Sequence, residues 1–350
     1  MATTFSSLLA LLDHGYDTVI DVRSPAEYAQ DHVPGAINLP ALSDAERAKV
    51  GTLYVQVAPF TARKTGAALV ARNVAAHLDG PLAGFDGSWR PLLYCWRGGQ
   101  RSGSFTSILT QIGWRADLLE GGYQSFRRLV HDALYDTEIP YDLILLGGYT
   151  GTAKTDLLHL LATSGVQVLD LEGMAGHRGS LLGTMPGGQP SQRAFESAIA
   201  CALARFDPAH PVIIEAESSK IGDRIIPPML WAAMKDAPRI EVDAPLPARA
   251  AYLVEAYADI IADTAELSRR LEILRRFRGA ETVARWQAML DAGDHTGLAT
   301  ALMADHYDPT YAASRGKQDP QILQRFEAGD LGAKGRAALV AEIAAWLAAR

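Results

Sequence analysis

Two α/β domains in series, each built on a parallel β-sheet, are predicted by three observations. Short apolar runs alternate with longer segments of helical periodicity, at residues 18–22, 91–94, 143–146, 166–171 and 212–214. Glycine, polar or charged residues follow each run, as they do at the carboxyl ends of parallel strands, where α/β proteins place their ligands. The length of 350 residues exceeds what a single hydrophobic core usually supports.

Composition places the chain among globular proteins. Hydrophobic residues make up 48% of the sequence, charged residues 21%, and the formal net charge is −7. This acidic balance argues against an unspecific nucleic-acid coat but permits a local basic face. Two cysteines exclude a disulfide framework and a four-ligand zinc site, and no apolar run reaches the ~18 residues of a membrane span. The first residues do not resemble a secretion signal, so we expect a reducing cytoplasm.

The first half of the chain begins with a short helix and then alternates strands with helices. Residues 8–12 are expected to form the helix, and residues 18–22 the first strand. Ser24 then caps a second helix, with Pro25 at its first position and Glu27 three residues after the cap. The next expected elements are a turn and strand at 32–39, helices within 41–78 and a strand at 91–94.

Cys95 occupies the turn between the strand at 91–94 and a following helical pattern. Gly98 and Gly99 shape this turn, and Arg97 and Arg101 add positive charge. Backbone N–H groups, the helix dipole and the two arginines all stabilise a thiolate relative to a thiol. We therefore predict that Cys95 is a catalytic nucleophile assisted by Arg97 and Arg101. The alternative is a buried, unreactive cysteine.

This half of the chain resembles a rhodanese domain, which we assign to residues 1–135. The resemblance is carried by residues 21–28, 32–36, 94–102 and 120–123. It implies that Cys95 carries sulfur or selenium. Five residues separate Cys95 from Arg101, a spacing that protein phosphatases and arsenate reductases also use. A phosphatase is therefore the alternative for this half alone.

A second domain is expected at residues 143–245, after a linker at 136–142. Its first strand leads into the pattern G-x-x-x-x-A-K-T, a phosphate-binding loop in which Ala153 replaces the usual glycine. Lysine would place a cation on a phosphate, threonine would reach a metal, and the amides would hold the oxygens. The loop residues that we assign to phosphate binding are Gly148, Gly151, Lys154 and Thr155. The alternative is an ordinary glycine-rich turn.

Polar residues also follow the strands expected at 166–171 and 212–214. His177 and Arg178 come after the first and are candidates for binding an anion, and Glu215 follows the second. Together with Thr155, Glu215 would hold Mg²⁺. For each residue taken singly, a solvated loop is the simpler interpretation. Between these segments a helix is expected at residues 192–206, and Cys201 is interpreted as a small residue of that helix.

The remaining residues, 246–350, are expected to be helical and to pack on the second domain. Leu267, Leu271 and Leu274 form an apolar stripe within a segment rich in arginine. Phosphate backbones are natural partners of such a cluster, and a solvated helix face is about as consistent with the charge alone. The candidate tRNA-binding residues are Arg269, Arg275 and Arg276.

Taken as a whole, the chain resembles the bacterial tRNA 2-selenouridine synthases, in which a rhodanese domain is fused to a phosphate-loop domain. Four further motifs carry this resemblance, at residues 172–180, 189–196, 215–218 and 306–311. It implies a transferase that geranylates wobble-position 2-thiouridine of tRNA with geranyl diphosphate and then exchanges the geranylthio group for selenium from selenophosphate. Cys95 would carry the selenium, and Lys154 with its loop would hold the diphosphate. No tightly bound cofactor is expected besides Mg²⁺.

Two other function classes fit the same motifs. One is an ATP-dependent enzyme, such as a kinase or sulfurtransferase fusion acting on another substrate. The other is a module that binds tRNA or carries a persulfide without catalysis. Magnesium-dependent ATP turnover would favour the first class, and dispensability of both Cys95 and Lys154 would favour the second.

Overall fold

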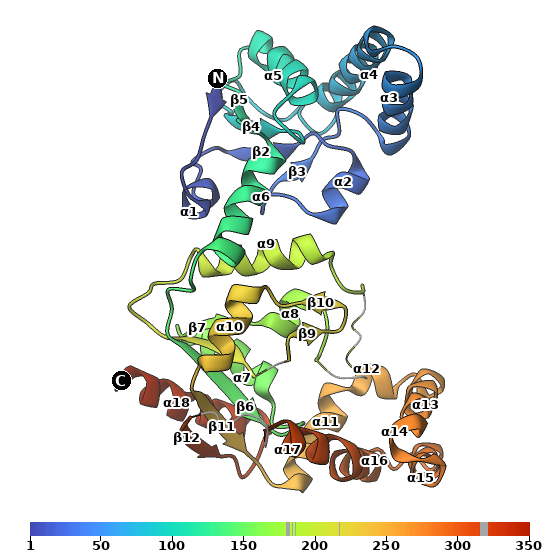
Figure 1. The fold of residues 1–350 in the computed structure, drawn as a ribbon, viewed down its shortest axis with the longest axis vertical. Helices are drawn as coiled ribbons and strands as arrows, with labels where there is room; N and C mark the ends of the chain where they lie inside the picture. The colour runs from blue at the N-terminus through green and yellow to red at the C-terminus, as the bar shows by residue number, and fades with distance from the viewer. Residues whose placement is uncertain (180–182, 184, 186, 217, 316–320) are drawn as a thin grey trace. The chain divides into compact units, whose positions relative to one another are not determined.

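The fold is described by a computed structural model that covers residues 1–179, 183, 185, 187–216, 218–315 and 321–350 (Figure 1). Ser180 and Glu217, which belong to two of the motifs above, lie outside these residues. The chain forms two compact units, Met1–Glu138 with Pro190–Arg205 and Ile139–Gln189 with Phe206–Arg350. Within the described part of the chain, no helix is long and apolar enough to cross a membrane.

The first unit contains a parallel sheet of five strands in the order β1-β5-β4-β2-β3, so the strand that precedes Cys95 is the central one. The strands are β1 (Ala2–Thr3), β2 (Thr18–Asp21), β3 (Ile37–Asn38), β4 (Pro91–Tyr94) and β5 (Asp117–Leu119). The helices are α1 (Leu8–Leu12), α2 (Pro25–Gln30), α3 (Asp44–Gln56), α4 (Pro59–Asp79), α5 (Gln100–Ile112), α6 (Tyr123–His131) and α9 (Gln192–Leu203).

Local sequence signals explain most of these elements. Ser24 and Glu27 form both halves of the predicted capping box at the start of α2. Gly113 ends α5 in the left-handed conformation that glycine adopts at little cost. The core beneath the sheet includes Ile20, Leu93 and Phe105, each fully buried. The predicted strands and helices of residues 8–94 are thereby confirmed.

Helix α9 lies in the second half of the sequence but packs in the first unit. The Ser197 hydroxyl donates to Asp31 Oδ2 at 2.8 Å, and the Tyr123 hydroxyl donates to the same oxygen at 2.8 Å. The guanidinium of Arg127, on α6, pairs with Glu196 on α9. Burial raises the pKa of Asp31 above its ordinary value, although these hydrogen bonds and the charge of Arg127 oppose the shift. These contacts hold α9 against the first unit.

The second unit contains another parallel five-stranded sheet, in the order β12-β11-β6-β8-β7, with the strand before the phosphate-binding loop at its centre. The strands are β6 (Leu143–Gly148), β7 (Gln167–Leu169), β8 (Val212–Glu215), β11 (Arg239–Asp243) and β12 (Ile322–Glu327). A separate hairpin is made of β9 (Lys220–Ile221) and β10 (Arg224–Ile225).

Most of the remaining helices belong to two groups. One group covers the sheet, and the other forms a helical cluster with its own core around Leu271 and Trp286. The helices of the unit are α7 (Lys154–Thr163), α8 (Leu171–Ala175), α10 (Pro228–Asp236), α11 (Leu246–Ala256), α12 (Ala258–Ile261), α13 (Thr264–Ile273), α14 (Arg275–Arg278), α15 (Ala280–Asp291), α16 (His295–Leu302), α17 (Asp308–Arg315) and α18 (Ala333–Ala348).

Two elements differ from the sequence prediction. The C-terminal region is not helical throughout, because β12 pairs with β11 and buries Phe326 in the core. Leu, Gln, Arg and Glu in this segment favour helix, but pairing at the sheet edge overrides that preference. The strand expected at 166–171 ends at Leu169, because the Asp170 side chain accepts a hydrogen bond from Gly173 N and caps α8.

Truncating Phe326 tests whether β12 belongs to the core. The side chain is 1% exposed and its ring packs edge-on to Trp346 at 6.0 Å. Phe326→Ala should lower the free energy of opening of β11 and β6 by about 3–5 kcal/mol, measured by amide hydrogen exchange. Phe277→Ala, at a 58% exposed position, is the control and should change it by less than ~0.5 kcal/mol. Equal protection of β11 in both variants would contradict the assignment.

Candidate functional site

The Cys95 thiol sits in a loop of hydrogen-bond donors at the carboxyl end of β4. The backbone amide of Gly99 donates to Cys95 Sγ at 3.2 Å, and the hydroxyl of Ser102 donates at 3.1 Å. The sulfur belongs to a side chain that is 3% exposed, and Ser102 is fully buried. The loop therefore surrounds the sulfur with donors that favour a negative charge.

The electrostatics of this loop favour the thiolate of Cys95. Burial alone would raise the pKa of Cys95, but hydrogen bonds from Ser102, amides of the loop and the charge of Arg101 outweigh it. The pKa of Cys95 is thereby lowered from its ordinary value. In contrast, burial raises the pKa of Cys201 on α9 to about 12, which makes that thiol a poor nucleophile. The two free cysteines thus have opposite chemical characters.

The two arginines of the loop have different surroundings. Arg97 is exposed, whereas Arg101 pairs with the carboxylate of Glu27 on α2, with 2.7 Å between Nη1 and Oε2. Burial opposes ionisation of Glu27, but the hydrogen bond from Arg101 outweighs it and lowers the pKa of that carboxyl. Sequence reasoning treated Glu27 only as part of a helix cap. The structure gives it the second role of holding Arg101 beside the cysteine loop.

A buried ion pair lies at the end of β2, next to the cysteine loop. Arg23 and Asp21 are both less than 2% exposed, and Arg23 Nη2 lies 2.6 Å from Asp21 Oδ2. The Arg23 guanidinium also lies 3.9 Å from the centroid of the Tyr123 ring, at the start of α6. Removing either charge would leave its partner buried and unpaired, a large cost. The pair therefore fixes the end of β2 next to the cysteine loop.

The phosphate-binding loop joins β6 to α7 as predicted. Ala153 adopts the left-handed conformation, with φ 60° and ψ 26°, at the position where the usual motif has glycine. The Lys154 ammonium donates to the backbone carbonyls of Gly148 at 2.9 Å and Tyr149 at 3.3 Å. Lysine is thus held across the loop, where it would meet a phosphate. Alanine thus occupies a left-handed position that glycine would adopt with less strain.

Residues from the C-terminal region form one side of this loop. Arg249, which is 6% exposed, pairs with Asp308 at 2.8 Å and donates to the carbonyl of Thr150 at 3.1 Å. The Tyr311 hydroxyl accepts a hydrogen bond from the amide of Gly148 at 2.9 Å. Asp308 and Tyr311 belong to the motif at 306–311, so this motif forms part of the protein wall beside the loop. Arg249 was missed, since no local pattern marks it.

Thr155 and Glu215, the predicted metal-binding residues, both lie close to Glu172, and metal binding there stays a prediction. The Thr155 hydroxyl donates to Glu172 Oε2 at 3.1 Å, so the carboxylate beside Thr155 is that of Glu172 on α8. Glu215 instead accepts hydrogen bonds from the amides of Leu171 and Glu172, at 3.0 and 3.4 Å. Burial and the neighbouring Asp170 carboxylate raise the pKa of Glu215 well above its ordinary value. A hydroxyl and a carboxylate are ligands that suit Mg²⁺, and Thr155 with Glu172 supplies both.

Arg178 and His177 lie beyond α8. Arg178 pairs with Asp259 at 3.0 Å, and its guanidinium lies 5.0 Å from the Tyr257 ring. Burial lowers the pKa of His177, and its buried Nδ1 has no hydrogen-bond partner among the described residues. Their role in phosphate binding stays a prediction.

An apolar cavity adjoins the phosphate-binding loop. It holds ≈ 620 Å³ of space, part of it open to solvent, and Thr150 of the loop is among its walls. The other wall residues come from α11 to α13, from α16 and from the π-helix η2 (Met303–Tyr307) that follows it, and include Leu253, Tyr257, Ile261, Leu298, Leu302 and Met303. A cavity of this kind would bind an apolar chain whose polar end lies on the loop.

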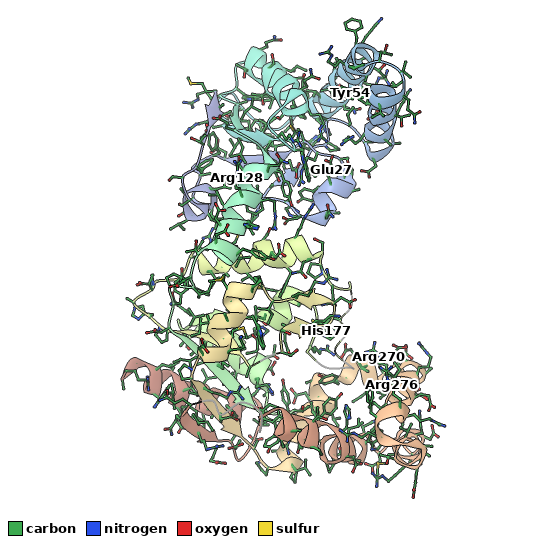
Figure 2. All side chains as sticks on the ribbon, viewed as in Figure 1. Glu27, Tyr54, Arg128, His177, Arg270 and Arg276 are labelled. Atoms are coloured by element: carbon green, nitrogen blue, oxygen red, sulfur yellow. The ribbon has the colours of Figure 1, made fainter. Side chains whose placement is uncertain are left out.

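The predicted tRNA-binding arginines lie on the helical cluster, which Figure 2 marks by Arg270 and Arg276. Leu267, Leu271 and Leu274 are buried as predicted, and the arginines project from the same segment. Arg269 pairs with Glu266 and Arg275 pairs with Glu272, both on the surface. Arg276 lies over the exposed Phe277 ring, at 4.6 Å. Exposed pairs of this kind contribute little, so phosphates could displace them, and tRNA binding here stays a prediction.

Comparison with known proteins covers both units. Residues 141–334 match the model of the tRNA 2-selenouridine synthase AAA domain, and residues 4–129 match that of the rhodanese-like domain. The tRNA 2-selenouridine synthase of Aeromonas salmonicida is 34% identical over 88% of this chain and 90% of its own length. That of Chromohalobacter salexigens is 32% identical over 87% of this chain and 88% of its own.

A solved structure also resembles part of the chain. It is the N-terminal domain of a putative ATP/GTP binding protein from Clostridium difficile, 32% identical over 37% of this chain and 98% of its own. Its TM-score of 0.31 is too low to inform the fold.

Removing the Ser102 hydroxyl tests the thiolate. Ser102→Ala should raise the pKa of Cys95 by about 1–2 units, because a hydrogen bond to a charged group is worth ~1.5–3 kcal/mol. The pH midpoint of iodoacetamide alkylation should move upward by that amount, so the variant reacts more slowly at neutral pH. The protein with Ser102 and the variant without it both carry Cys201→Ser, so Cys95 supplies the thiol that is measured. An unmoved midpoint would show that Ser102 does not stabilise the thiolate.

Restoring glycine tests the strain at Ala153. The left-handed conformation costs alanine ~1–2 kcal/mol, a cost that glycine would avoid. Glycine also has more conformational freedom in the unfolded chain, which offsets ~0.4–1 kcal/mol of this gain in stability. Ala153→Gly should therefore raise the thermal midpoint of the second unit by up to about 4 °C. Ala338→Gly, at an exposed position within α18, should lower it, because helical glycine costs ~1 kcal/mol. Equal losses in both variants would contradict strain at Ala153.

Proposed function

Since this chain belongs to the tRNA 2-selenouridine synthase family, we propose that it converts wobble-position 2-thiouridine of tRNA into 2-selenouridine through an S-geranylated intermediate. Geranyl diphosphate and selenophosphate are the proposed co-substrates, and Cys95 is the proposed selenium carrier. The observation that carries the prenyl step is the apolar cavity that borders the phosphate-binding loop. The free state of Cys95 fits a reducing compartment, and we place the reaction in the cytoplasm.

The second unit would perform the geranyl transfer. The carbon–oxygen bond to diphosphate breaks while the thiouridine sulfur forms a bond to the same carbon. Lys154 would exchange its contacts to the carbonyls of Gly148 and Tyr149 for oxygens of the departing diphosphate. The apolar cavity would bind the prenyl chain, with a gain of about 0.8 kcal/mol for each buried CH₂ group. One loop and one cavity thus account for the two ends of the donor.

Magnesium would be held by Thr155 and Glu172, which lie next to each other at the start of α7 and α8. When bound, it would neutralise charge on the diphosphate leaving group. The chain itself supplies the amides of the loop and Lys154, which bind and orient the same group.

The first unit would deliver selenium. Geranylation converts the resistant thiocarbonyl into a thioimidate, so C2 becomes open to attack. The selenium of selenophosphate then forms a bond to C2 while the bond from C2 to the geranylthio sulfur breaks and the geranylthiol departs. Water cleaves the phosphorus–selenium bond and releases phosphate, so selenium stays at the selenide level throughout. The amides and Arg101 around Cys95 would bind the selenophosphate anion, and the low pKa of Cys95 keeps the sulfur available as a nucleophile.

The two stages should be separable by mutation. Lys154→Ala should lower the geranylation rate ~10²-fold or more, because a charge-assisted contact to the leaving group is lost. The same variant should still exchange selenium on tRNA already geranylated by the wild-type protein. Cys95→Ser should show the reverse pattern. Mass spectrometry of the tRNA nucleosides, after geranyl diphosphate alone and then after selenophosphate, measures both stages.

A third variant tests the cavity. Ala299→Trp fills part of the space next to the helical wall and should abolish geranylation without affecting selenium exchange.

Loss of both stages in folded Cys95→Ser, or normal geranylation by Lys154→Ala, would contradict the assignment of one stage to each unit.

A further inference from the structure

The helical hairpin formed by α3 and α4 ends in an exposed apolar tip. The two helices pack against each other in the first unit, and Figure 2 labels Tyr54 on this hairpin. The ring of Tyr54 is 57% exposed and that of Phe60 is 72% exposed. Val55 and Val57, between them, are 84% and 65% exposed. Apolar side chains gathered within seven residues on a surface point to a binding site.

The same hairpin is positively charged in an acidic chain. Residues 47–78 contain five lysines and arginines and no aspartate or glutamate, whereas the whole chain has a net charge of −7. All five cations are exposed: Arg47, Lys49, Arg63, Lys64 and Arg72. The tip residues Tyr54, Val55, Val57 and Phe60, together with Lys49, Arg63 and Lys64, are called the hairpin surface below. Its charge is complementary to a polyanion.

The base of the hairpin reaches the cysteine loop. Arg47 Nε, on α3, lies 3.9 Å from Glu27 Oε2, and the same carboxylate oxygen is 2.7 Å from Arg101 Nη1. Arg101 lies in the first turn of α5, directly after the loop of Cys95. The hairpin surface therefore belongs to an element whose base contacts Glu27, the residue that holds Arg101 beside Cys95.

We propose that the hairpin surface binds unpaired nucleotides of RNA, with bases stacked on Tyr54 and Phe60 and phosphates on Lys49, Arg63 and Lys64. Exposed aromatic rings flanked by cations are the two components of single-strand recognition. Identifying this RNA as the anticodon loop of the substrate tRNA rests on the proposed function, in which the modified base must be unpaired to react. The acidic residues of α3 and α4, Asp44, Glu46 and Asp79, lie at the base of the hairpin, and residues 47–78 contain none. This positive charge toward the tip favours RNA over a protein partner.

Binding measurements with surface variants test this proposal. The probes are a 2-thiouridine-containing tRNA and a 15-nucleotide oligouridylate, followed by fluorescence anisotropy across a salt series. Tyr54→Ser combined with Phe60→Ser should raise Kd at least ~10-fold and leave the salt slope unchanged, because stacking on one ring is worth roughly 5- to 150-fold. Arg63→Ala combined with Lys64→Ala should flatten the slope of log K against log salt by about 1.4, from ~0.7 for each single-strand phosphate contact.

Matched controls lie elsewhere in the same unit. Ile112→Ser, at a 51% exposed position, and Arg115→Ala, at an exposed position, should leave both Kd and slope unchanged. A wild-type Kd in both hairpin variants would overturn the proposal. The proposal would also be overturned if the double variant Tyr54→Ser, Phe60→Ser lost binding to phosphatidylglycerol vesicles but bound tRNA with the wild-type Kd. Hairpin-dependent RNA binding without geranylation or selenium exchange would support the hairpin surface and refute the proposed chemistry.

Discussion

The turn from a central parallel strand into a helix is the constraint on which both candidate sites depend. In the first unit β4 is the middle strand and is followed by Cys95, and in the second unit β6 is the middle strand and is followed by the phosphate-binding loop. Backbone N–H groups at such turns have no partner within the helix, so they point toward the space in front of the sheet. Each turn therefore favours negative charge in front of its sheet, which is the thiolate of Cys95 in one unit and, as we propose, a phosphate in the other.

Buried charges keep these turns in place. Arg23 with Asp21 supports the cysteine loop, and Arg249 with Asp308 supports the phosphate-binding loop. Because each pair is desolvated, its stabilising effect depends on both partners being present. The pairs thus restrict loops that would otherwise be able to move away from the sheet edge.

The chain crosses between the two units three times, because α9 is inserted from the second half of the sequence into the first unit. Asp31, Ser197 and the pair of Arg127 with Glu196 hold this helix. The motif at 189–196 lies at the second crossing. Its polar residues therefore have a structural role, since Glu196 among them helps to hold α9.

The sequence by itself determined the α/β class, the positions of most strands and helices, and the two loops that carry Cys95 and Lys154. These features depend on apolar runs, glycines and caps that lie within about ten residues of each other, so their signal is local. Ser102 was within reach of the same reasoning, since it lies one helical turn beyond Gly99, but nothing local shows that its hydroxyl faces the sulfur.

Only the tertiary structure decided which distant residues meet. The carboxylate that contacts Thr155 directly is that of Glu172, while Glu215 accepts hydrogen bonds from the first two amides of α8. Arg249 and Tyr311 reach the phosphate-binding loop from positions about a hundred or more residues away. The cavity, the pairing of β12 and the place of α9 are decided likewise by packing between elements. Long-range packing of this kind leaves no periodic trace in the segments that it joins, and a single sequence therefore does not reveal it.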